Sequence, residues 1–345
     1  MTQSNPITLI GSPPSPYTRK MVALMRYRHI AYRIIWDNPV AILDEMGVAK
    51  PKVSLLPTYV LPDEEGEMQA VCDSTPIIRR LETEHEGGSV IPDDPAMAFI
   101  DYLLEDFADE WATKYMFHYR WHLEVDADNA GTLLPLFQTI NLPAEQLNHF
   151  KPYITERQVG RQHVVGSNDV TAPVIDASYK RLLTAMEAHL TQQPYLMGNR
   201  PGASDFALYG QLTQLVGFDP TPRVIAHSLS PRTVAYTSLM EDQNGLEPKA
   251  SDWGTAETVP ETLKAILNEV GHVYAPALLA NAQAMQAGEK TWEAEIDGSR
   301  WTQQTFNYQG KCLQWINAEY QALSQADRAR VDGLLAGTGC EKIIF

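Results

Sequence analysis

Two hydroxyl side chains, Ser15 and Thr18, lie in the segment Ser15-Pro16-Tyr17-Thr18, between a short apolar run and a predicted helix. Two cysteines at this spacing, C-x-x-C, would support thiol–disulfide exchange. Hydroxyls form neither a disulfide nor a mixed disulfide, so the segment excludes that chemistry. A hydroxyl at a helix N-terminus can instead donate a hydrogen bond to an anion, including the thiolate of another molecule. Alternatively, Ser15 only caps the helix, since serine is a favoured N-cap residue.

The elements that must position this segment follow a β-α-β order. Apolar, β-prone runs predict four strands, at residues 7–10, 31–35, 58–61 and 68–71. Helical spacing predicts two helices, over residues 18–29 and 74–84. An irregular or helical stretch separates the second and third strands. The first β-α-β unit favours a parallel strand pair with a right-handed crossover. A linker rich in Gly, Pro and Asp follows, at residues 85–95.

Beyond residue 95 the sequence predicts mostly helices, with one exception near the C-terminus. There the segment 291–301 alternates around Asp297-Gly298, which is a strong signal for a β-hairpin. The changes in pattern predict three parts: an α/β domain at 1–86, an all-helical domain at 95–250 and an extension at 255–345. We expect the extension to pack on the helical domain.

Composition excludes several kinds of partner. The chain has 345 residues, is 44% hydrophobic and carries a formal net charge of −16. Such a charge repels nucleic-acid phosphates and anionic membrane surfaces. No apolar run approaches the ~18 residues of a membrane span, and the N-terminus shows no signal-peptide pattern. We therefore expect neither a nucleic-acid partner nor a membrane one.

Cysteine and histidine usage points to a reducing compartment and no metal. The three cysteines are far apart and form no C-x-x-C pair, so we predict no disulfide framework and a cytoplasmic location. The nine histidines show no ligand spacing, so we predict no metal site.

Four motifs, in this order, resemble the glutathione transferase superfamily, and the resemblance covers residues 7 to 250. They are Ser15-Pro16-Tyr17, as in serine-type bacterial members; Leu56-Pro57, where the family has a cis-proline; CDSTPII at 72–78; and GNRPGASDFALYGQL at 198–212. The resemblance implies a thioredoxin-like N-terminal domain followed by the family's all-helical domain. The extension has no counterpart in a minimal member. The cap of the central helix also departs from the pattern, because Gly202 stands where Ser or Thr is usual and leaves Asp205 to satisfy exposed N–H groups.

The same resemblance implies a glutathione site and a homodimer. Ser15 would activate the thiol of glutathione for attack on a hydrophobic electrophile. The tripeptide would be held by Tyr17, Lys52, Leu56, Pro57, Asp73 and Ser74. Lys52 lies five positions before the proline, farther than is usual, and a solvated loop lysine is an equal alternative. Asp73 and Ser74 would bind the ammonium and carboxylate of the γ-glutamyl group, or would only cap the helix that follows.

An aromatic cluster in the second domain suggests the electrophile pocket. Helical spacing puts Trp111, Tyr115 and His118 on one face, beside Tyr119. We predict that these four side chains line a pocket between the domains, with His118 available as a general acid or base. The alternative is that they are core and domain-interface residues.

Two other functions compete with the transferase hypothesis. The chain could be a non-catalytic binding or scaffold protein, with its extension as the partner surface; a scaffold should tolerate loss of Ser15, and an enzyme should not. Lyase and isomerase activities also occur on this fold. A thiol–disulfide reductase lacks an active-site cysteine, unless Cys72 serves.

Overall fold

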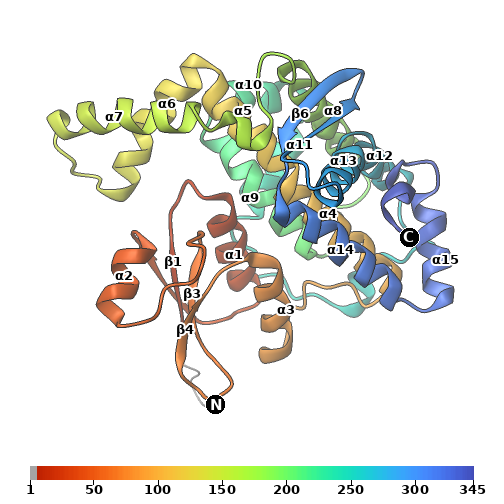
Figure 1. Cartoon of the computed structure of the whole chain (residues 1–345). Coiled ribbons are helices and arrows are strands. Elements are labelled where there is room, and N and C mark those ends of the chain that lie inside the picture. Colours follow the sequence, from red (N-terminus) through yellow and green to blue (C-terminus); the bar gives the residue numbers. More distant parts are fainter. Residues whose placement is uncertain (1–5) are drawn as a thin grey trace.

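The computed structural model describes residues 6–345, and its N-terminal part is a mixed sheet with helices on both faces (Figure 1). The strands are β1 (Ile7–Gly11), β2 (Tyr32–Trp36), β3 (Thr58–Pro62) and β4 (Met68–Val71). Their order in the sheet is β2-β1-β3-β4. β1 and β2 pair in parallel, as the β-α-β order predicts, while β3 is antiparallel to both β1 and β4. The predicted thioredoxin-like domain is confirmed.

Three helices cover this sheet. They are α1 (Pro16–Tyr27), α2 (Pro39–Met46) and α3 (Ser74–Glu84). α2 covers one face, where its Leu43 packs with Ile10 and Val60 in a small separate cluster. α1 and α3 lie on the other face and belong to the main core, which continues into the helical region. The site predicted at the start of α1 therefore lies against the second domain.

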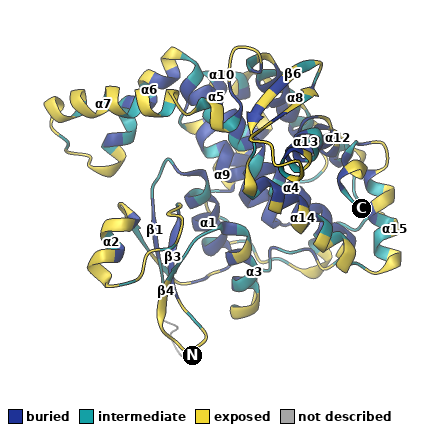
Figure 2. Cartoon of the chain, viewed as in Figure 1, coloured by how far each residue is buried: buried dark blue, intermediate teal, exposed yellow. Residues whose placement is uncertain are grey.

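The helical region is built around one buried central helix, α9 (Figure 2). Its helices are α4 (Pro95–Glu110), α5 (Ala112–His122), α6 (Glu124–Gln138), α7 (Ala144–Val159), α8 (Ala172–His189), α9 (Ala203–Gly217), α10 (Pro220–Leu229) and α11 (Pro231–Leu239). The α6–α7 pair projects from the body, and no residue of α7 is buried. No helix within residues 6–345 is long and apolar enough to cross a membrane.

Two local features of α9 concern its N-terminal cap and its contact with α1. The N–H of Gly202 donates to Asp205 over 2.9 Å, so the predicted substitute for a Ser or Thr cap is confirmed. A Cβ added at Gly210 would lie 2.4 Å from the carbonyl oxygen of Pro16 and 3.1 Å from Cβ of Lys20. Glycine at this position therefore lets the two helices approach closely.

The extension packs on the helical region and carries the predicted hairpin. Its elements are α12 (Glu261–Glu269), a π-helical turn (Val270–Tyr274), α13 (Ala275–Gln286), β5 (Thr291–Ile296), β6 (Ser299–Gln304), α14 (Asn307–Ala322) and α15 (Gln325–Leu335). Asp297 and Gly298 both have positive φ, 51° and 72°, as a type I′ turn requires. Trp292 and Trp301 anchor the hairpin in the core, and α14 and α15 both contact α4.

Candidate active site

Ser15 is the N-cap of α1, and its hydroxyl keeps its hydrogen free for a ligand. Its side chain accepts a hydrogen bond from the backbone N–H of Thr18 at 3.2 Å. Because that bond uses an oxygen lone pair, the O–H remains available as a donor. Thr18 is fully buried and accepts from the N–H of Ser12 instead. Ser15 is 8% exposed and Thr18 is 0% exposed, so of the two residues in the segment only Ser15 keeps some exposed surface.

Tyr17 crosses from α1 to α4. Its hydroxyl donates to the backbone carbonyl of Asp109 at 2.8 Å. Burial, followed by the nearby carboxyls of Glu110 and Asp109, raises the pKa of Tyr17 well above its usual value. The phenol therefore stays neutral and serves as a donor between the two domains.

The loop before β3 presents Leu56 and Pro57 as the family pattern predicts. The Leu56–Pro57 peptide bond is cis, which confirms that prediction. Pro57 is buried and Leu56 is half-buried, whereas Lys52 is exposed earlier in the same loop. Lys52 thus lies within the loop without being fixed by packing.

Asp73 and Ser74 start α3 in a strained backbone conformation. Asp73 has φ 88°, which is unusual for a residue with a side chain, and its carboxylate makes no capping hydrogen bond to α3. Such a conformation costs about 1–3 kcal/mol and is most common at functional sites. Ser74 is buried and is the first residue of the helix.

Lys20, which the sequence analysis missed, contacts one of the predicted site residues, Ser74. Its ammonium is fully buried and donates to Ser74 Oγ at 3.0 Å, Glu105 Oε1 at 2.8 Å and Asp109 Oδ2 at 2.6 Å. Burial acts to lower the pKa of Lys20, but Asp109 and Glu105 outweigh it and raise that pKa. The sequence did hold a signal that Lys20 is buried, because it lies one turn before Leu24 on the apolar face of α1.

This arrangement sets the hydrogen-bonding role of Ser74. An ammonium only donates, so Ser74 Oγ must be the acceptor in its bond with Lys20. The hydrogen of Ser74 is then free for another acceptor, such as a ligand carboxylate. The charge of Lys20 is paired with Glu105 and Asp109, so Lys20 acts here by fixing the orientation of the Ser74 hydroxyl.

A row of carboxyl groups on α4 faces the junction between the domains and the extension. Burial is the main cause that raises the pKa of Asp109 to about 6, of Asp106 to about 7 and of Glu110 to about 8. Asp106 accepts from the hydroxyl of Tyr274 at 2.6 Å. Within residues 6–345 no group of three or more His, Cys, Asp or Glu side chains is arranged to hold a metal ion.

These raised pKa values predict that the protein loses stability with rising pH. Between the unfolded and folded pKa values the native state holds protons that the unfolded chain has released. The stability that Asp106 and Glu110 contribute is fully present below about pH 4. It is lost as the pH rises through about 7 for Asp106 and about 8 for Glu110. Urea unfolding from pH 5.5 to 8.5 should show a falling free energy of unfolding.

The matched control for this pH effect is Glu110→Gln, which cannot titrate. This substitution should make the fall of the free energy of unfolding with pH shallower, by up to about 1.4 kcal/mol per pH unit. A free energy of unfolding that rises over this range, with a slope unchanged by the substitution, would contradict the assignment.

The predicted aromatic pocket needs correction. The side chains of Trp111, Tyr115, His118 and Tyr119 are only 0–3% exposed. Trp111 and Tyr115 share Ser178 Oγ as a hydrogen-bond partner on α8. Because α5 packs against α4, α6, α8 and α9, these side chains belong to the core. They do not line a pocket open to solvent.

The bonds of the other two aromatic residues support the same conclusion. His118 Nδ1 bonds Ser167 Oγ at 2.8 Å, and the Tyr119 hydroxyl donates to Asp176 at 2.7 Å. Burial and then His122 lower the pKa of His118 to about 4. His118 is therefore a neutral core residue near pH 7 and is not placed to act as an acid or base on a substrate.

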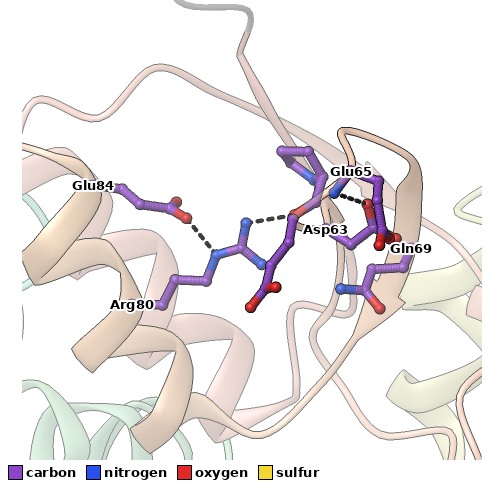
Figure 3. Close-up of a pocket in the computed structure, with 7 residues that line it drawn as sticks. Asp63, Glu65, Gln69, Arg80 and Glu84 are labelled. Carbon is purple, nitrogen blue, oxygen red and sulfur yellow. Dashed lines mark hydrogen bonds and ion pairs between the residues drawn. The ribbon is translucent and has the colours of Figure 1, made fainter.

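A cavity of about 590 Å³ opens elsewhere, between the β3–β4 turn and α3 (Figure 3). Arg80 lies across it and donates to the carbonyl of Pro62 and to Glu84, each at 2.6 Å. Asp63 accepts from backbone N–H groups of its own turn. The polar groups drawn here are thus largely engaged with one another, and none of the predicted glutathione residues lines this cavity.

Comparison with protein families finds two matches, one in the N-terminal part and one in the helical region. Residues 9–89 match the model described as glutathione S-transferase, N-terminal domain, and residues 161–240 match the glutathione S-transferase, C-terminal domain. This chain belongs to the glutathione S-transferase superfamily. Ser15, Pro57, Asp73 and Ser74 lie within the first match and α9 within the second. The extension lies outside both matches.

Solved glutathione transferases cover much of the chain at low identity. A Tau class enzyme from mango, Mangifera indica, is 14% identical with a TM-score of 0.37, over 75% of this chain and 95% of that one. A glutathione S-transferase from Methylobacterium radiotolerans, in complex with glutathione sulfonate, is 17% identical with a TM-score of 0.39, over 74% and 95%. A family member from Pseudomonas fluorescens, with two glutathione bound, is 16% identical with a TM-score of 0.41, over 69% and 89%. No curated protein sequence matched the chain. Likeness at this level transfers no residue role.

Proposed function

We propose that this superfamily member is a glutathione transferase in which Ser15 donates a hydrogen bond to the glutathione thiolate. The observation that carries the proposal is the geometry at the start of α1. There the Ser15 oxygen accepts a hydrogen bond from the N–H of Thr18, which leaves the O–H of Ser15 free to donate. Ser15 also lies within the part of the chain that matches the family's N-terminal domain.

The magnitudes are sufficient for thiol activation. A cysteine thiol has a pKa of about 8.5, and lowering it by ~2 units requires ~2.7 kcal/mol of preference for the anion. A hydrogen bond to a charged group contributes about 1.5–3 kcal/mol, and a helix N-terminus adds about 0.3–1 kcal/mol. Ser15 and the first turn of α1 can therefore supply the shift together.

The γ-glutamyl end of glutathione is proposed to bind at the start of α3. Ser74 offers its free O–H to the carboxylate, and the hydrogen bond from Lys20 to Ser74 Oγ holds that hydroxyl in place. Asp73 offers a carboxylate to the ammonium. We further propose that the backbone of Leu56, ahead of Pro57, pairs with the middle of the tripeptide, and that Tyr17 and Lys52 border its remaining length.

In the proposed reaction, the glutathione thiolate attacks an electrophilic carbon, a C–S bond forms and the leaving group departs with its electron pair. A nitro-substituted aryl chloride is a suitable probe, since it releases chloride. The hydrophobic character of the natural electrophile, a homodimeric assembly and a cytoplasmic location remain part of the proposal. The aromatic cluster on α5 belongs to the core, so it does not support the hydrophobic character of the electrophile.

Calorimetric titration with glutathione tests the site directly. The wild type should bind with micromolar to millimolar affinity, and Asp73→Ala/Ser74→Ala should weaken binding at least about tenfold, because both contacts to a charged group are lost. The control, Glu64→Ala/Glu65→Ala, removes exposed carboxylates from the β3–β4 turn and should bind normally. Absence of wild-type binding would favour the scaffold alternative.

A further inference from the structure

The extension reaches the end of the site where the γ-glutamyl group is proposed to bind. The hydroxyl of Tyr308, in the first turn of α14, donates to Asp73 Oδ2 at 2.8 Å. These residues are 235 positions apart in the sequence. Asp73 is thus shared between the N-terminal domain and a segment that lies outside both family matches.

This contact defines how Asp73 can act. Burial, followed by the charge of Asp73, raises the pKa of Tyr308 far above its usual range, so the phenol remains a donor. Among the described side chains, it is the hydroxyl of Tyr308 that donates a hydrogen bond to the carboxylate of Asp73. Each carboxylate oxygen has two acceptor sites, so Asp73 keeps capacity for a ligand ammonium.

The start of α14 is held firmly enough to orient Asp73. Asn281 clamps the backbone of Phe306 on both sides, accepting from its N–H at 2.8 Å and donating to its carbonyl at 3.0 Å. The ring of Tyr308 packs edge-on against Trp315, with centroids 5.7 Å apart. The next residue, Gln309, is buried beside Glu110 of α4.

We propose that Tyr308 is a positioning residue that fixes Asp73 to receive the ammonium of the γ-glutamyl group. The inference rests on the proposed function. It assigns the extension a role in ligand binding, so that the site is completed by three parts of one chain: α1, α3 and α14.

The test compares two ligands on wild-type protein and Tyr308→Phe. One ligand is glutathione, and the other is its deamino analogue, glutaryl-cysteinyl-glycine, which lacks only the ammonium. Tyr308→Phe should weaken glutathione binding about three- to tenfold, the effect of one lost hydrogen bond. It should leave the affinity for the analogue unchanged. A fold defect would weaken both ligands alike, so the ratio of the two affinities isolates the ammonium contact.

Two further variants complete the design. Tyr320 lies on α14, as Tyr308 does, and its hydroxyl donates to Asp332 at 2.6 Å. Tyr320→Phe should leave the ratio of the two affinities unchanged. Tyr308→Gln retains a donor and should recover part of the selectivity for glutathione, even if the phenylalanine variant is unstable. If Tyr308→Phe has the wild-type unfolding transition and leaves the ratio of the two affinities unchanged, or if it binds glutathione more tightly, the inference is overturned while the proposed function stays intact. No wild-type binding of glutathione would overturn both.

Discussion

Replacing Lys20 by methionine should lower the free energy of unfolding by about 3–5 kcal/mol, the usual cost of removing one partner from a buried ionic network. The ammonium of Lys20 is the direct ion-pair partner of Glu105 and Asp109, whose side chains are 1% and 10% exposed. Without it, both carboxylates must stay charged in the interior or take up protons. Urea denaturation near neutral pH measures the effect.

The same substitution elsewhere provides the control. Lys180 pairs with Asp176 at 2.6 Å on α8, but the two side chains are 45% and 38% exposed. Lys180→Met should cost less than about 1 kcal/mol. Lys20→Met combined with Glu105→Gln and Asp109→Asn should recover much of the loss, since no buried charge is then left unpaired. If Lys20→Met lowers the free energy of unfolding no more than Lys180→Met does, the buried network does not stabilise the fold as proposed.

Replacing Ser15 by alanine should reduce kcat/KM with glutathione and an aryl chloride about 10- to 100-fold, the equivalent of one hydrogen bond to a thiolate. The ultraviolet absorbance of the bound thiolate, titrated against pH, should show a thiol pKa raised by about 1–2 units. These two measurements separate activation of the thiol from binding of the tripeptide.

The Ser15 variant also loses a helix cap, which costs about 1 kcal/mol of stability, so activity must be compared where both proteins are folded. Ser12→Ala removes a neighbouring, partly exposed hydroxyl and should retain normal activity. If Ser15→Ala has full activity and an unchanged thiol pKa, Ser15 is only a cap. The thiolate must then be stabilised elsewhere, or the chain is a scaffold.

The sequence by itself determined the features that depend on a few neighbouring residues. The strand at 68–71 and the helix at 74–84 have the predicted bounds, because turn residues and periodicity act locally. The Asp297-Gly298 hairpin and the Asp205 substitute cap also need only a few residues in register. The motifs at Ser15 and Asp73 could be found for the same reason: each lies at the start of a helix, and such starts have local signatures.

Only the tertiary structure decided which side chains meet. Trp111 and Tyr115 have the spacing of a pocket face, but α5 is enclosed by other helices, so periodicity could not separate a core face from a site face. The partners of Lys20 come from α3 and α4, and that of Asp73 from α14. Hydrogen bonds across 54 to 235 residues leave no pattern in one sequence, because packing of whole elements sets them.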